Sequence, residues 1–197
     1  MPIRRTKQRM TNKGKLIVIS GPSGVGKGTV IRRILSECEN IKLSVSATTR
    51  EPRQEDTEGV TYFFKTKDQF RNMIEKGEFL EWAIYNENYY GTPIGPVEKQ
   101  REDGIDVLLE IDVQGALNVM EKCRDGIYIF IAPPSKEVLR ERLCGRGSES
   151  PEEIEKRVAA AVAELEVQDR YDYIVVNNIL DDAVREVKDI IEGKDLL

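Results

Sequence analysis

The stretch from residue 16 to residue 29 constrains the fold of this chain more than any other. Five aliphatic or small residues, LIVIS at 16–20, lead into GPSGVGKGT at 21–29, and apolar residues then recur at helical spacing. This order predicts a buried strand, a tight glycine-rich loop and a helix, which is the setting that a phosphate-binding loop requires. Glycines let successive backbone N–H groups and the helix N-terminus converge on an anion, while Lys27 reaches the terminal phosphates. The predicted nucleotide-binding residues of the loop are Gly21, Pro22, Ser23, Gly24, Val25, Gly26, Lys27, Gly28 and Thr29.

The residue after the loop lysine departs from the usual form of this motif. Most such loops place Ser or Thr there to hold Mg²⁺, whereas this chain has Gly28 followed by Thr29. The GKGT form is more typical of nucleoside monophosphate kinases than of GTPases or motor ATPases. We therefore expect Thr29, or water alone, next to the metal ion.

Composition excludes several classes of protein. A chain of 197 residues with 40% hydrophobic and 33% charged residues fits one soluble α/β domain with insertions. The chain contains no histidine, which excludes Ser-His-Asp catalysis and His-ligated zinc. The net charge of -5 argues against a nucleic-acid binder. Three widely spaced cysteines fit reduced thiols in a cytoplasmic protein.

The first fourteen residues form a segment of their own. Residues 1–14 are basic and lack any apolar run, so we expect a flexible tail there, not a signal peptide or a membrane span.

Strand and helix patterns alternate along the rest of the chain. Further strands are predicted at 41–46, 62–64, 79–85, 89–90, 107–111, 127–132 and 173–176. The runs at 107–111 and 127–132 are nearly continuous in apolar residues, which is typical of buried parallel strands. Capping signals predict helix starts at Thr66, at Thr92 with Pro93, at Ser135 and at Ser150 with Pro151. We therefore predict an α/β fold of the three-layer P-loop NTPase type, with a small mixed sheet and one helix inserted at about 47–92.

Two clusters of charged residues lie near the predicted strand ends. Arg50 and Arg53 flank Pro52, so their guanidinium groups could converge on one phosphate; a solvated polar loop is the alternative. Glu110 and Asp112 follow an apolar strand and share one of its faces, at the carboxyl edge where parallel sheets bind ligands. A role with Mg²⁺ competes there with a capping or salt-bridge role.

A third cluster combines Arg142, Arg146 and Arg157 with the glycines at 145 and 147. Such a segment could close over a transferring phosphoryl group and offset its developing charge. Solubility of a helix face is the alternative for these arginines.

Taken together, these stretches resemble the guanylate kinase family over nearly the whole chain. Besides the loop at 21–29, the matching stretches are SVSATTREPR at 44–53, EGVTYFF at 58–64, EFLEWA at 78–83, NYYGTP at 88–93, EIDVQG at 110–115, FIAPPS at 130–135 and RLCGRG at 142–147. The resemblance implies Mg²⁺-dependent transfer of the ATP γ-phosphoryl group to GMP, and also to dGMP, in cytoplasmic purine metabolism. It also implies a core at 15–46, 93–135 and 159–197, a GMP-binding insertion at 47–92 and a helical lid at 136–158.

The resemblance also assigns roles to single residues. The GMP phosphate would be held by Arg50, Arg53, Tyr62 and Tyr90, and the guanine would be read by Ser46, Glu81 and Thr92, with Glu110 and Asp112 completing the GMP site. The catalytic residues would be Lys27, Arg50, Arg142, Arg146 and Arg157. The metal would lie near Thr29 and Asp112, and Asn177 would approach the adenine of ATP. Thr92 and Glu110 stand where some relatives carry Ser and Asp, and both keep the needed oxygen.

Glu81 gives this resemblance a physical basis. Guanine presents N1–H and its amino group as adjacent donors, so one ionised carboxylate can accept both. Adenine lacks this pair and would leave the carboxylate desolvated and unpaired, so AMP is disfavoured.

Two alternatives remain open. One is a non-catalytic guanylate-kinase-like module that binds phosphorylated peptides, in which a degraded loop or missing lid arginines would be expected. The other is a kinase for a different nucleoside monophosphate, which Glu81 together with Thr92 disfavours.

Overall fold

A computed structural model describes residues 13–144 and 151–194. Its main sheet has the strand order β2-β7-β1-β8-β9, with every neighbouring pair parallel. The strands are β1 (Leu16–Ser20), β2 (Ile41–Leu43), β7 (Asp106–Glu110), β8 (Ile127–Ala132) and β9 (Tyr173–Val176). The predicted parallel sheet is thereby confirmed, and its central strand is the one that leads into the glycine-rich loop.

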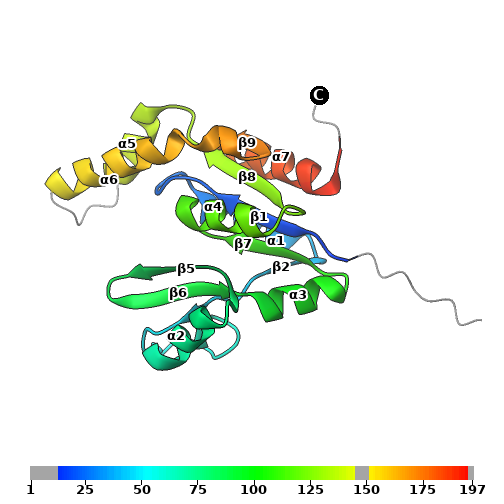
Figure 1. Cartoon of the computed structure of the whole chain (residues 1–197). Coiled ribbons are helices and arrows are strands. Elements are labelled where there is room, and N and C mark those ends of the chain that lie inside the picture. Colours follow the sequence, from blue (N-terminus) through cyan, green and yellow to red (C-terminus); the bar gives the residue numbers. More distant parts are fainter. Residues whose placement is uncertain (1–12, 145–150, 195–197) are drawn as a thin grey trace, which may run out of the picture.

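Helices cover both faces of this sheet (Figure 1). One face packs on α1 (Lys27–Glu37) and α7 (Leu180–Glu192), and the other on α3 (Ile94–Glu102) and α4 (Val113–Lys122). The side chains of β1 alternate between the two cores. Ile17 and Ile19 face the core with α1 and α7, and Leu16 and Val18 face the core with α3 and α4. Each fully buried aliphatic side chain contributes about 1.5–3 kcal/mol, so β1 is held from both sides and its end is a rigid platform.

The insertion forms a second, mixed sheet in the order β4-β3-β6-β5. Its strands are β3 (Ala47–Thr48), β4 (Phe63–Phe64), β5 (Phe79–Tyr85) and β6 (Asn88–Pro93). Only the β3–β4 pair is parallel. The helix α2 (Lys67–Glu75) covers this sheet and begins with the predicted capping box of Thr66 and Gln69. Phe70 of α2 stacks on Phe79 of β5, with ring centroids 4.4 Å apart, so the insertion has a small core of its own.

Two predicted boundaries are wrong. The strand expected at 41–46 ends at Leu43, because the chain then leaves the main sheet and joins the small sheet at Ala47. The helix start expected at Thr92 and Pro93 is shifted, because β6 continues through Pro93 and α3 begins at Ile94. The Thr92 hydroxyl does not cap this helix but donates to Glu81 on the neighbouring strand. Strand pairing places Thr92 opposite Glu81, which turns the hydroxyl to the carboxylate and not to the start of α3.

Two helices, α5 (Lys136–Cys144) and α6 (Pro151–Leu165), pack on each other through Leu139, Leu143 and Ala161. The hydroxyl of Ser135 accepts from the backbone N–H of Val138, which confirms the predicted cap of α5. In Figure 1 this pair and the β5–β6 hairpin project from the same side of the core. A 3₁₀ turn, Gln168–Arg170, leads into β9.

The cap predicted at Ser150 lies outside the described residues. Across residues 13–144 and 151–194, every helix is too short or too polar to span a membrane.

Candidate active site

The glycine-rich loop has the conformation of a phosphate-binding loop. Gly21, Gly24 and Gly26 have φ values of 142°, 83° and 94°, a region that side-chain-bearing residues rarely adopt. A Cβ atom on Gly21 would lie 2.3 Å from the carbonyl oxygen of Ile131 in β8. The loop therefore turns tightly over the end of the sheet and runs directly into α1, whose N-terminal N–H groups favour an anion.

Lys27 lies inside this loop, surrounded by carboxylates. Its ammonium group donates to the carbonyl oxygens of Gly21 and, at 3.4 Å, Pro22. Burial lowers the pKa of Lys27, and the nearby charges of the three carboxylates oppose that decrease. These carboxylates belong to Glu164, Glu110 and Asp112. The cation is thus held within a site of mixed charge rather than in open solvent.

Asn177 supports the loop from beneath. Its amide nitrogen donates to the carbonyl oxygen of Val25 at 2.8 Å, and its side chain is buried. Arg142 of α5 donates to the same carbonyl at 3.3 Å and to the backbone oxygen of Asn177 at 3.1 Å. Asn177 was expected near the adenine of ATP; this role stays a prediction, and the described hydrogen bond ties its side chain to the loop backbone.

The helix α6 reaches the loop through Arg157 and Glu164. Arg157 donates to the hydroxyl of Ser23 at 3.2 Å. Burial raises the pKa of the Glu164 carboxyl, and the charge of Lys27 opposes that rise. Sequence reasoning missed Glu164; its spacing of seven residues from Arg157, two helical turns on one face, was the available signal. The predicted catalytic Arg146 lies outside the described residues.

Glu81 marks the other end of the site, on β5. Burial raises the pKa of its carboxyl, and the charge of Asp112 adds to that rise, whereas the hydrogen bond from Thr92 opposes it. The ammonium of Lys122 in α4 donates to the carbonyl oxygens of residues 79 and 80, at 3.0 and 2.8 Å. This contact ties β5 to the core, so Glu81 is held at a defined distance from the main sheet.

The start of α4 packs directly against Glu81. Asp112 caps this helix, and its Oδ1 accepts from the N–H of Gly115 at 2.7 Å. A Cβ atom on Gly115 would lie 3.2 Å from Glu81 Oε2. Glycine at this position therefore permits the close approach of the helix to the buried carboxylate.

Arg50 and Tyr62 form a second polar group in the insertion. Arg50 donates to Asp56 at 2.8 Å and lies over the ring of Tyr62, 5.4 Å from its centroid. Tyr62 and Tyr90 meet edge to face, with centroids 6.0 Å apart. Asp56 also accepts from the backbone N–H of Arg53. The pKa of Asp56 is held below its usual range, mainly by the hydrogen bond from the backbone N–H of Arg53 and also by the one from the Arg50 side chain. Sequence reasoning missed Asp56, whose partner lies six residues earlier in the chain.

Three adjoining cavities connect the loop to Glu81. The first, of about 270 Å³, lies over the loop; it shares Lys27 and Glu110 with the second, of about 440 Å³. The second shares Ser46, Tyr62 and Asp112 with the third, of about 290 Å³, which Glu81 and Tyr90 also line. The structure thus brings most predicted site residues to one continuous depression. Eight predicted residues within the described part of the chain are not among its lining, namely Gly21, Val25, Arg50, Arg53, Thr92, Arg142, Arg157 and Asn177.

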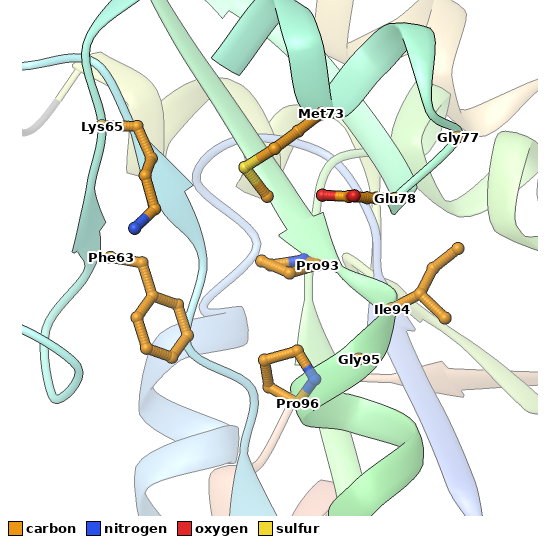
Figure 2. Close-up of a pocket in the computed structure, with 9 residues that line it drawn as sticks. All are labelled: Phe63, Lys65, Met73, Gly77, Glu78, Pro93, Ile94, Gly95 and Pro96. Atoms are coloured by element: carbon orange, nitrogen blue, oxygen red, sulfur yellow. The ribbon is translucent and has the colours of Figure 1, made fainter. Parts of the chain in front are cut away.

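A larger cavity, of about 490 Å³, lies elsewhere (Figure 2). It separates the small sheet from the start of α3, and its walls are mostly apolar, with Phe63, Met73 and Pro96 among them. Lys65 and Glu78 contribute its charged groups. Its lining contains none of the predicted site residues, so its size does not make it the reaction site.

The acidic residues of the site fit a metal ion that is carried by phosphates. The described residues contain no group of three or more Cys, Asp or Glu side chains placed to hold a metal. Glu110 and Thr29 both line the loop cavity. One carboxylate and one hydroxyl fit Mg²⁺, which keeps several waters and binds mainly through substrate phosphates. Asp112 caps α4, so its predicted contact with the metal stays a prediction.

The comparisons with known proteins agree with this geometry. A sequence model of a family described as guanylate kinase matches residues 13–194. A guanylate kinase of Caldanaerobacter subterraneus subsp. tengcongensis is 51% identical over 179 residues, covering 91% of this chain and 87% of that protein. A guanylate kinase of Bacillus subtilis is 50% identical over 188 residues, covering 95% and 92%. The crystal structure of guanylate kinase from Anaplasma phagocytophilum superposes with a TM-score of 0.70 at 33% identity, covering 92% of this chain and 86% of that one.

Proposed function

Since the chain belongs to the guanylate kinase family and is a nucleoside monophosphate kinase that uses ATP and GMP, we propose how its residues divide the work. ATP binds over the loop at 21–29 as its Mg²⁺ complex, and GMP binds in the cavity between Tyr62 and Glu81. The continuity of the cavities from Lys27 to Glu81 carries this proposal. One end offers a phosphate loop and the other a buried carboxylate, so the two nucleotides meet with their phosphates facing each other.

Glu81 selects the base. Its carboxylate is buried and pre-oriented by Thr92, so it accepts both N1–H and the amino group of guanine. An adenine in the same place would leave it desolvated and unpaired.

Arg50, Arg53, Tyr62 and Tyr90 hold the phosphate of GMP. Arg50 is already fixed by Asp56 and by the ring of Tyr62, so little side-chain freedom is lost when the phosphate arrives. A planar guanidinium matches two phosphate oxygens at once.

The phosphoryl transfer needs no general base. A GMP phosphate oxygen attacks the γ-phosphorus of ATP, a new P–O bond forms, and the bond to the β-phosphate oxygen breaks with its electron pair leaving on ADP. The second pKa of a phosphate monoester is about 6, so the nucleophile is already ionised at neutral pH. Lys27 and the arginines stabilise the charge on the transferring group by position. Bound Mg²⁺ supplies further neutralisation of the ATP phosphates.

The helix α5 and the first part of α6, up to residue 158, form the lid. Arg142 and Arg157 already contact the loop from these helices, so a movement of the pair changes the surroundings of the ATP phosphates directly. Closure excludes water and so prevents wasteful hydrolysis of ATP. We propose that the chain divides into a core at 15–46, 93–135 and 159–197, an insertion at 47–92 and a lid at 136–158.

The proposed contacts involve the base and the phosphate of GMP but not its sugar. Because dGMP differs from GMP only in the sugar, dGMP serves as an acceptor as well. We also propose a cytoplasmic location, where both nucleotides are available and where the free thiols of Cys38, Cys123 and Cys144 stay reduced.

A coupled assay of ADP release tests the proposal. With Mg-ATP as donor, turnover is measured with GMP, dGMP, AMP, CMP and UMP as acceptors. We expect GMP and dGMP to exceed the others in kcat/KM by at least about 100-fold, given the cost of an unpaired buried carboxylate. Higher turnover with AMP than with GMP would contradict the choice of acceptor. A folded protein that is silent with every acceptor would favour the phosphopeptide-binding alternative.

A further inference from the structure

Arg32 of α1 lines the loop cavity, although no motif of the sequence points to it. Its Nη2 donates to the hydroxyl of Thr29 at 3.2 Å. The side chain thus lies one helical turn beyond Thr29, on the side of the helix that faces the cavity.

Gly28 leaves room for the Arg32 guanidinium. A Cβ atom built on Gly28 would lie 3.5 Å from Arg32 Nη1 and 3.4 Å from Glu110 Oε1. The hydroxyl of a serine or threonine at position 28 would extend farther into this gap. The absent side chain therefore opens the space between a guanidinium and a carboxylate, at the rim of the loop cavity.

The charges around the loop favour a further cation for a polyanionic substrate. Glu110 and Asp112 line a cavity together with Lys27, and their carboxylates repel the phosphates of ATP. The described hydrogen bond of Arg32 goes to a neutral hydroxyl, so its charge can be shared with an incoming phosphate. The neighbouring Arg33 differs, since it pairs with the carboxylates of Glu37 and Asp181 on the α7 side of α1.

We propose that Arg32 is an additional ATP-binding residue, which contacts the inner phosphates of the nucleotide and orients Thr29 beside them. Arg32 lines the loop cavity together with Gly28 and Thr29 of the first turn of α1, where the helix N-terminus favours the phosphates that lie against the loop. A guanidinium fork matches two phosphate oxygens, which a lysine cannot do. The inference rests on the proposed ATP site over the loop.

The test compares Arg32→Ala and Arg32→Lys with Arg33→Ala as the matched control. We expect Arg32→Ala to raise the KM for Mg-ATP about five- to tenfold, the usual effect of a partly exposed charge-assisted hydrogen bond. The KM for GMP should change less than about twofold, and Arg32→Lys should fall between the two. Arg33→Ala should leave both KM values unchanged, and thermal melting confirms that each variant is folded.

Binding of Mg-ADP, measured by calorimetry, separates the inner phosphates from the terminal one. ADP keeps the α- and β-phosphates, so its affinity should fall in Arg32→Ala by the same factor as that of ATP. An unchanged KM for Mg-ATP, an equal rise in Arg33→Ala, or an unchanged ADP affinity would each overturn the assignment. The ADP measurement does not depend on turnover, so a failure of the proposed acceptor and a failure of Arg32 remain distinguishable.

Discussion

The hydroxyl of Thr92 donates to Oε1 of Glu81 at 2.6 Å, and both side chains are buried on adjacent strands of the small sheet. A buried carboxylate is costly for a folded protein, because burial disfavours its charged form. The protein keeps this one next to the cavity, with a single hydroxyl as its described side-chain donor. The carboxylate therefore keeps acceptor capacity for a ligand that brings further donors. The free-energy cost of burying it can be measured as a change in protein stability.

Glu81→Gln should stabilise the protein without ligand at high pH. Burial raises the pKa of Glu81 in the folded state, so the folded protein binds the proton more tightly than the unfolded chain does. The free energy of unfolding of the wild type therefore falls as pH rises through that pKa. We expect the variant to have the higher Tm at pH 8, and the difference to shrink as pH falls below the Glu81 pKa. The exposed Glu78→Gln is the control; a Tm difference independent of pH would contradict the prediction.

The same Glu81→Gln change should relax base selection. The amide presents a donor where guanine also presents donors, so binding of GMP loses one hydrogen bond and gains a repulsion. We expect the ratio of kcat/KM for GMP over AMP to fall at least about tenfold, given a cost of more than about 1.4 kcal/mol for this mismatch. The ratio is measured in the coupled assay, and an unchanged ratio would mean that Glu81 does not read the base.

Lys27→Ala should remove most turnover while leaving GMP binding nearly intact. Lys27 lines the loop cavity, whereas Glu81 and Tyr90 line the cavity proposed for GMP. Losing a cation at the transferring group costs at least about 100-fold in kcat. Calorimetry with GMP should show an affinity within about twofold of the wild type, and an affinity loss as large as the loss of turnover would refute this division of roles.

Asn177→Ala should weaken every triphosphate donor equally. Its amide holds the carbonyl of Val25, and removing it leaves Arg142 as the remaining described donor. We expect kcat/KM to fall about tenfold for both ATP and ITP, since a buried carbonyl that loses a partner costs about 1–3 kcal/mol.

The neighbouring and exposed Asn178→Ala serves as the control and should behave like the wild type. A loss confined to ATP would instead assign Asn177 to recognition of adenine.

Local sequence signals determined much of the fold of this protein. The buried run before the loop, the glycines of the loop and the capping box at Thr66 depend on side-chain period and turn chemistry within a few residues. These signals predicted the parallel sheet, the insertion and the position of the phosphate loop. The motif resemblance then predicted the family, which the comparisons confirm.

The tertiary structure decided which side chains meet. The strands β3 and β4 have two residues each, too few for a periodic signal, and exist because their partners are present. Thr92 was expected at a helix start, and strand pairing turned its hydroxyl to Glu81. Asn177 holds a carbonyl 152 residues away in the chain. Such contacts depend on how the layers pack around β1, and no local pattern of residues encodes that distance.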